Sequence, residues 1–143
     1  KVRVVHGDYG LHNCLIGPNS TVAAVVDWEI STLGDPLADL AYALNSFPDP
    51  EDEIPVAPEA ATNVPSMPTR SDLMQRYANR TDRDISNIDY YYGFNRWKSA
   101  CIVHGVYARY MLGNKSSEGV DLEHMRTRIE AALTLAAQAV NRI

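Results

Sequence analysis

The spacing of polar residues in the first thirty positions constrains this chain more than any other feature. A carboxylate stands five residues before a carboxamide in the string His6-Gly7-Asp8-Tyr9-Gly10-Leu11-His12-Asn13, and a second apolar run ends in Val25-Val26-Asp27-Trp28-Glu29. Each acidic cluster follows a short β-branched run, which is typical of a strand. Because two successive hairpin strands bring their ends together, we expect residues about 14 positions apart to face a common ion.

Composition and charge exclude several classes of protein. The chain has 143 residues, of which 45% are hydrophobic and 22% charged, as in an ordinary globular domain. Its net charge is −5 and it has no run of Lys or Arg, which argues against nucleic-acid and anionic-membrane partners. No segment is apolar enough to span a bilayer. Cys14 and Cys101 have no CxxC spacing and are predicted to be reduced core thiols, which indicates a cytoplasmic protein.

Strand signals come before residue 35 and helix signals after it, so we predict an α+β fold. Strands are expected over 2–5, 14–16 and 22–26, the last two joined by a turn at Gly17-Pro18-Asn19-Ser20. Helix starts are predicted from Asp35-Pro36, from a Thr69/Asp72 capping box and from Asp121. The predicted helices cover 36 to about 46, 70 to about 79, 87–112 with Gly113 as the residue after the cap, and 122–140.

The segment from Phe47 to Pro68 carries six of the eight prolines and is predicted to be a surface loop. Its acids either attract a cationic ligand or are simply solvated. Gly93 and Gly105 either weaken the long helix or allow close packing. Residues at helical spacing are predicted to form the inward faces: Trp97, Cys101, His104, Ala108 and Met111 on the long helix, and Leu122, Met125, Ile129, Leu133, Ala136 and Val140 on the last.

The acids and the amide in the first thirty residues form the set that phosphoryl transfer requires. Such a reaction needs a base that orients the attacking hydroxyl, and oxygen ligands that hold Mg²⁺ against the nucleotide phosphates. We predict that Asp8 is the base. We predict that Asn13 and Asp27 are the metal ligands, since Mg²⁺ prefers hard oxygen atoms.

Four neighbouring residues have a structural interpretation, and for three of them a direct role in the site is the alternative. His6 is expected to hold the loop in shape through hydrogen bonds to nearby carbonyls. His12 either touches phosphate or packs, and Glu29 either approaches a second ion or holds an arginine. Asp39 either favours the dipole of its helix or accepts backbone N–H groups of the loop and thereby fixes Asp8.

Two other functions are alternatives to phosphoryl transfer. His6, Asp8 and His12 are a possible zinc or iron set for a metal-dependent hydrolase. That interpretation leaves Asn13 and Asp27 unexplained. A binding module that no longer turns over is the other alternative, although the complete acid and amide set argues against it.

These residues also resemble a known family. His6-Gly7-Asp8 with Asn13 resembles the catalytic loop of the aminoglycoside phosphotransferase and choline kinase group, relatives of the protein kinases, and Asp27-Trp28-Glu29 stands where protein kinases have Asp-Phe-Gly. The segment 33–41 is similar to the helix that follows the metal site in that group. Its aspartate, here Asp39, braces the catalytic loop. The same segments resemble the phosphotransferase-like domain that some animals carry fused to acyl-CoA dehydrogenases.

The resemblance implies an ATP- and Mg²⁺-dependent kinase that acts on a hydroxyl of a small molecule. By carry-over, Asp8 is the base, and Asn13 and Asp27 hold the metal. The implied fold is the C-terminal lobe of a kinase, with residues 1–143 as its later part and the nucleotide-binding N-terminal lobe absent. We therefore expect the chain alone to be inactive, and its exposed apolar surface to be covered by the missing lobe or another chain.

Overall fold

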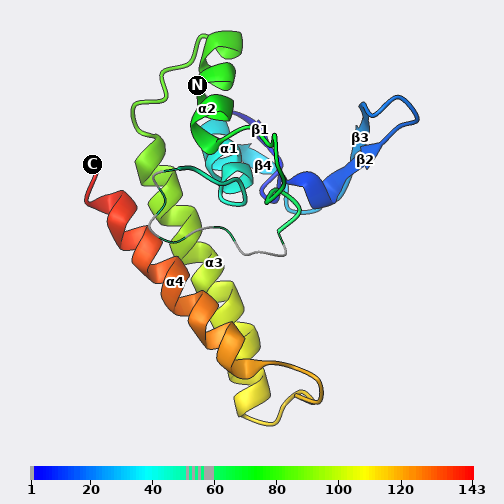
Figure 1. The fold of residues 1–143 in the computed structure, drawn as a ribbon, viewed down its shortest axis with the longest axis vertical. Coiled ribbons are helices and arrows are strands. Elements are labelled where there is room, and N and C mark those ends of the chain that lie inside the picture. Colours follow the sequence, from blue (N-terminus) through cyan, green and yellow to red (C-terminus); the bar gives the residue numbers. More distant parts are fainter. Residues whose placement is uncertain (1, 51, 53, 55, 57–59) are drawn as a thin grey trace.

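A computed structural model describes residues 2–50, 52, 54, 56 and 60–143 (Figure 1). The fold is α+β, as predicted: in the part of the chain that the structure describes, the strands lie within the first 34 residues and four α-helices follow them. The elements are β1 (Arg3–Val5), a 3-10 turn η1 (Leu11–Asn13), β2 (Cys14–Ile16), β3 (Val22–Val25), β4 (Thr32–Gly34), α1 (Pro36–Leu44), α2 (Arg70–Thr81), α3 (Ile88–Met111) and α4 (Leu122–Val140).

The strands form two antiparallel pairs, one nested inside the other in chain order. β2 pairs with β3 as the predicted hairpin, and β1 pairs with β4 so that Val4 lies opposite Leu33. β4 was not predicted, because Thr32-Leu33-Gly34 has a single large apolar residue, whereas the predicted strand 14–16 is an apolar run. The nesting makes two connections, 6–13 and 26–31, run between the same two strand pairs. The hairpin of β2 and β3 projects away from the helices (Figure 1).

The core lies where α1, α3 and α4 meet. Leu37, Ala41 and Leu44 of α1 are buried against Ile88 and Tyr92 of α3 and, in α4, Ala139. α3 and α4 lie side by side along most of their length, and α2 contacts α1 (Figure 1). The other face of α1 does not contribute to this core, so its side chains can contact the connection 6–13.

Helix boundaries follow the local signals closely. Asp35 caps α1 by accepting the amide of Leu37 at 3.0 Å. Thr69 and Asp72 form the predicted capping box of α2. Gly113 has a φ of +70° after the end of α3, as expected of a residue that terminates a helix.

The predicted inward face of α3 is wrong. Trp97 and Met111 are 52% and 59% exposed, and Cys101 and His104 are exposed as well. The buried face instead carries Ile88, Tyr92, Gly93, Asn95 and Ala100, because α1 and α4 contact the helix from that side. On α4 the prediction is correct for Ile129 and Ala136 and wrong for Leu133 and Val140, which are exposed.

Most described residues between 47 and 68 lie outside helices and strands, as predicted, but two of the acids are neither solvated nor free. Asp49 accepts the amide and hydroxyl of Ser71, and Asp52 pairs with Arg70. These acids thus fix the first turn of α2. Glu51, Glu53 and Glu59 lie outside the described residues.

Cys14 is partly buried and Cys101 is exposed, so the prediction of two core thiols is wrong for Cys101. Among the described helices, none combines the length and the apolar character that a membrane crossing requires.

Candidate active site

The two connections between the strand pairs are held together by Val26. Its carbonyl oxygen lies 2.8 Å from Nε2 of His6, and its amide donates to the carbonyl of Asn13 at 2.9 Å. The nested pairing of β1 with β4 and of β2 with β3 brings 26–31 alongside 6–13. The residues of the two predicted clusters therefore share one region of the molecule.

His6 has a structural role in this region. It is 1% exposed, its Nδ1 accepts the amide of Asp8 at 3.3 Å, and its Nε2 donates to Val26. These two bonds define the neutral tautomer with the proton on Nε2. The ring also packs against Trp28, with centroids 4.7 Å apart. Both ring nitrogens are thus engaged by the backbone, and neither is available to a metal.

Asp39 contacts the loop from α1. Its carboxylate accepts the amide of His6 through Oδ2, and that of Gly7 through Oδ1 at 2.8 Å. Backbone amides bonded to a carboxylate form charge-assisted hydrogen bonds, which are stronger than neutral ones. The structure thus has the contacts expected if Asp39 accepts backbone N–H groups of the loop and thereby fixes Asp8.

Several side-chain hydrogen-bond donors surround Asp8. Nδ2 of Asn13 donates to the carbonyl of Asp8 at 2.8 Å and lies 3.4 Å from its Oδ2; Nε2 of His12 also lies 3.4 Å from Oδ2. Burial raises the pKa of Asp8, but hydrogen bonds from Tyr42, His12 and Asn13, together with the charge of His12, outweigh it and lower that pKa below its ordinary value. The carboxylate is therefore ionised at neutral pH.

The two predicted metal ligands, Asn13 and Asp27, differ from each other in burial and in their contacts with Asp8. Asn13 is buried, and its Oδ1 takes part in no hydrogen bond among the described residues, because Nδ2 makes the contacts to Asp8. Asp27 is exposed, has a φ of +68°, and lies next to Val26, whose amide reaches Asn13. Within the described ranges, neither Asp27 nor Glu29 makes a side-chain hydrogen bond or ion pair. The structure therefore brings Asn13 against Asp8, and brings Asp27 near them only through the backbone.

Two residues that contact this loop were missed from the sequence. Tyr42 hydrogen-bonds Asp8 from α1, and burial, this hydrogen bond and the Asp8 charge raise the pKa of Tyr42 to about 12. Lys98 of α3 donates to the carbonyl of Gly7 at 3.3 Å. Tyr42 is three residues after Asp39 and so shares its helix face, a signal that the sequence contains. Lys98 is 91 residues from Gly7, and no local pattern indicates it.

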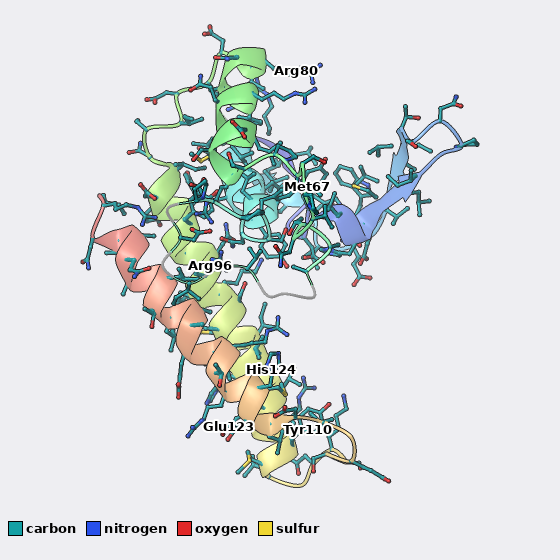
Figure 2. All side chains as sticks on the ribbon, in the orientation of Figure 1. Met67, Arg80, Arg96, Tyr110, Glu123 and His124 are labelled. Carbon is teal, nitrogen blue, oxygen red and sulfur yellow. The ribbon has the colours of Figure 1, made fainter. Side chains whose placement is uncertain are left out.

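A cavity of about 450 Å³ lies beside the loop and is lined by residues of the loop, α1, α3 and α4, among them His12, Tyr42, Asn45, Arg96 and Arg128. Arg96, labelled in Figure 2, donates to the carbonyl of Asn45 at 2.7 Å and has no ion-pair partner among the described residues. Both side-chain polar atoms of Asn45 are buried, and the described part of the chain holds no hydrogen-bond partner for either. The cavity wall therefore carries polar side chains next to His12 and Tyr42, which both interact with Asp8.

The hydrolase interpretation lacks its site. Over 2–50, 52, 54, 56 and 60–143, no group of three or more His, Cys, Asp or Glu side chains is placed to hold a metal. His6 in particular is committed to Val26 and to the amide of Asp8.

Comparisons with known proteins agree with this arrangement. The model of the "Phosphotransferase enzyme family" matches residues 1–73. "Acyl-CoA dehydrogenase family member 11" of Gallus gallus is 35% identical over 121 residues, which is 80% of this chain and 16% of the relative. The Rattus norvegicus protein of that name is 37% identical over 123 residues (80% and 15%), and "Acyl-CoA dehydrogenase family member 10" of Mus musculus is 35% identical over 123 residues (82% and 11%).

No solved structure matches the chain. The chain spans about one-sixth or less of the length of these relatives. The family match includes the loop with Asp8 and Asn13, the segment with Asp27, and helix α1 with Asp39. The chain therefore belongs to the phosphotransferase enzyme family, within the group that resembles acyl-CoA dehydrogenase family members 10 and 11.

Proposed function

We propose that the protein transfers the γ-phosphoryl group of ATP to a hydroxyl of a small molecule, with Asp8 as the base. The observation that carries the proposal is the state of the Asp8 carboxylate. It is ionised and oriented by Asn13, His12 and Tyr42, on a loop that Asp39 clamps through its backbone. A base for phosphoryl transfer must be held in this way, because catalysis of that reaction is mostly positioning and electrostatics.

We assign Mg²⁺ to Asn13 and Asp27. Oδ1 of Asn13 has no hydrogen bond to a described residue, and the exposed carboxylate of Asp27 has none either, so a hard-oxygen donor set is present. Mg-ATP, when bound, supplies the phosphoryl group and neutralises its developing charge. The chain's own residues hold the base and the two oxygen ligands on adjacent connections. Asp8 accepts the proton of the attacking hydroxyl at a carboxylate oxygen.

We place the alcohol in the cavity beside the loop. His12 and Tyr42 line that cavity and both interact with Asp8, so a hydroxyl bound there lies next to the residues that surround the carboxylate. Small-molecule sites are concave and offer a few polar groups that fix orientation. Arg96 and Arg128 supply such groups in the cavity wall.

Asp8→Asn in the full-length protein tests the role of the base. We expect phosphoryl transfer to fall by a factor of about 100 to 10,000, the usual contribution of a positioned base, while ATP binding changes little. Transfer is measured as ATP consumption against a panel of alcohols, amino sugars and hydroxyacyl thioesters. Asp27→Ala, by comparison, should raise the Mg-ATP concentration that is needed for half-maximal rate.

Retention of most turnover by Asp8→Asn would refute the base assignment. A wild-type protein that binds Mg-ATP but phosphorylates no member of the panel would favour the non-catalytic binding module. Tightly bound stoichiometric zinc, in place of a millimolar Mg²⁺ requirement, would favour the hydrolase.

A further inference from the structure

Lys98 of α3 stands beside the loop of Asp8. Its Nζ lies 3.3 Å from the carbonyl oxygen of Gly7 and 5.1 Å from the centroid of the Tyr42 ring. Among the described residues, no carboxylate lies within ion-pair distance of it. A lysine has three donors and a point charge, so one ammonium group can serve both a carbonyl and an aromatic face.

The Gly7 peptide is thereby held from two helices. Its amide donates to Asp39 of α1 at 2.8 Å, and its carbonyl accepts from Lys98 of α3. Gly7 has a φ of +86°, which a side chain opposes, and Asp8 is the next residue. A peptide restrained on both edges has little freedom to rotate, so these contacts limit the direction in which the Asp8 side chain leaves the backbone.

Tyr42 acts on the other end of Asp8. Its interaction with the Asp8 carboxylate contributes to the raised pKa of Tyr42, while Lys98 lies over its ring at 5.1 Å from the centroid. The cation attracts the π-electrons of the ring and so fixes the ring plane from which the hydroxyl reaches Asp8. One lysine therefore contacts both the residue that precedes Asp8 and the residue that orients its carboxylate.

We infer that Lys98 and Tyr42 are a pair of positioning residues for Asp8, with Lys98 holding the Gly7 carbonyl and the Tyr42 ring at once. This inference rests on the proposed function, in which Asp8 must point at a hydroxyl. A hydrogen bond to a charged group contributes about 1.5–3 kcal/mol, equivalent to a factor of about 10 to 150 in rate if it acts only in the transition state.

The test uses Tyr42→Phe, Lys98→Met and Lys98→Arg in the full-length protein. Matched controls come from the end of α3 and the segment after it, where Lys115 lies over the ring of Tyr110 at 5.2 Å. Figure 2 labels Tyr110 at the far end of α3 from the strands. Tyr110→Phe and Lys115→Met therefore remove a hydroxyl and a cation of the same kind away from Asp8.

We expect Tyr42→Phe and Lys98→Met to lower kcat about tenfold or more, with KM for Mg-ATP within about twofold of wild type. Lys98→Arg should recover most of that loss, because arginine also donates to a carbonyl and stacks on an aromatic ring. The control variants should keep wild-type kcat. A merely structural role would lower stability without this split between kcat and KM and without rescue by arginine.

Amide hydrogen exchange gives a readout that does not depend on activity. The amides of Gly7 and Asp8 should exchange about tenfold faster in Lys98→Met than in wild type or Lys115→Met, because loosening of the loop exposes them. If wild type phosphorylates nothing, the proposed function fails, and the exchange rates still decide whether Lys98 holds the loop. The inference is overturned if Tyr42→Phe and Lys98→Met keep wild-type kcat, or if exchange is unchanged.

Discussion

Gly7 has a backbone conformation that a side chain would oppose in two ways. Its φ of +86° disfavours L-residues, and a Cβ at this position would lie 3.0 Å from the backbone oxygen of Ile30. That oxygen belongs to the neighbouring connection and cannot rotate away as a side chain does. The close approach of the two connections at the candidate site therefore depends on the absence of a side chain at Gly7.

Gly7→Ala and Gly113→Ala separate these two effects. Gly113 also has a positive φ, +70°, but its Cβ would have no neighbour within 4 Å. We expect Gly113→Ala to cost about 1–2 kcal/mol of unfolding free energy from the backbone conformation alone. Gly7→Ala should cost about 1–3 kcal/mol more, the usual range for overpacking. Urea denaturation measures both, and equal costs would show that the Ile30 contact is unimportant.

The pH dependence of stability also has a residue-scale origin in Tyr42. Its pKa is raised to about 12 from the ordinary value of 10.0. Because the folded state binds the proton more tightly than the unfolded state, the stabilisation is fully present below pH 10 and is lost as the pH rises toward 12. Wild type should therefore lose its stability advantage over Tyr42→Phe across this range. Urea midpoints at pH 8, 10 and 11.5 measure it; a constant difference would contradict the raised pKa of Tyr42, which burial and then Asp8 produce.

At the scale of elements, the two glycines of α3, Gly93 and Gly105, differ in what surrounds them. A Cβ on Gly93 would lie 3.2 Å from Val140 and 3.3 Å from the carbonyl of Ala136, so Gly93 lets α4 approach closely. Gly105 has nothing within 4 Å of its Cβ position. The open question from the sequence thus has a different answer at each position: close packing at Gly93, and a weakened helix at Gly105.

Alanine at these two positions should have opposite effects. Gly105→Ala should stabilise the protein by about 0.5–1 kcal/mol, because alanine restricts the unfolded chain and favours the helix. Gly93→Ala has the same propensity gain but must push α4 away, and we expect net destabilisation of up to about 2 kcal/mol. Thermal unfolding of the two variants tests this, and stabilisation by both would mean that α4 yields easily.

The elements also show where sequence prediction succeeds. Caps at Asp35, Thr69 and Asp121 were correct because a cap is made by residues within three positions of one another. The inward face of α3 was wrong because the helix carries apolar residues all round. Trp97 and Tyr92 are both large and apolar, and only contact with α1 and α4 determines that Tyr92 is the buried one.

At the scale of the whole molecule, apolar surface remains uncovered on the outer face of the β1–β4 pair. Val2, Val4 and Leu33 are 64%, 64% and 72% exposed, whereas Val5 on the other face is 6% exposed. Exposed apolar patches of this kind mark interaction surfaces. Since the chain spans only a small fraction of its relatives, we propose that another part of the same protein, or another chain, covers this face.

ATP binding tests this view of the molecule. The 143-residue chain alone should bind Mg-ATP more weakly than the full-length protein by a factor of about 100 or more, equivalent to about 2.8 kcal/mol of binding free energy. The physical reason is that a kinase-like site divides its contacts with the nucleotide between the metal ligands and a separate phosphate-covering loop. Titration calorimetry measures both affinities. Equal affinities would show that residues 1–143 hold all the nucleotide contacts.

The sequence alone determined the family, the α+β order of elements and the helix ends, since motifs and caps rest on short spacings, and it predicts Asp8, Asn13 and Asp27 as site residues. Only the tertiary structure decided what surrounds Asp8. β4 pairs with β1, and Tyr42 and Lys98 reach the loop, across separations of 27 to 91 residues. Contacts of that range depend on how helices pack in three dimensions, and no local pattern encodes them.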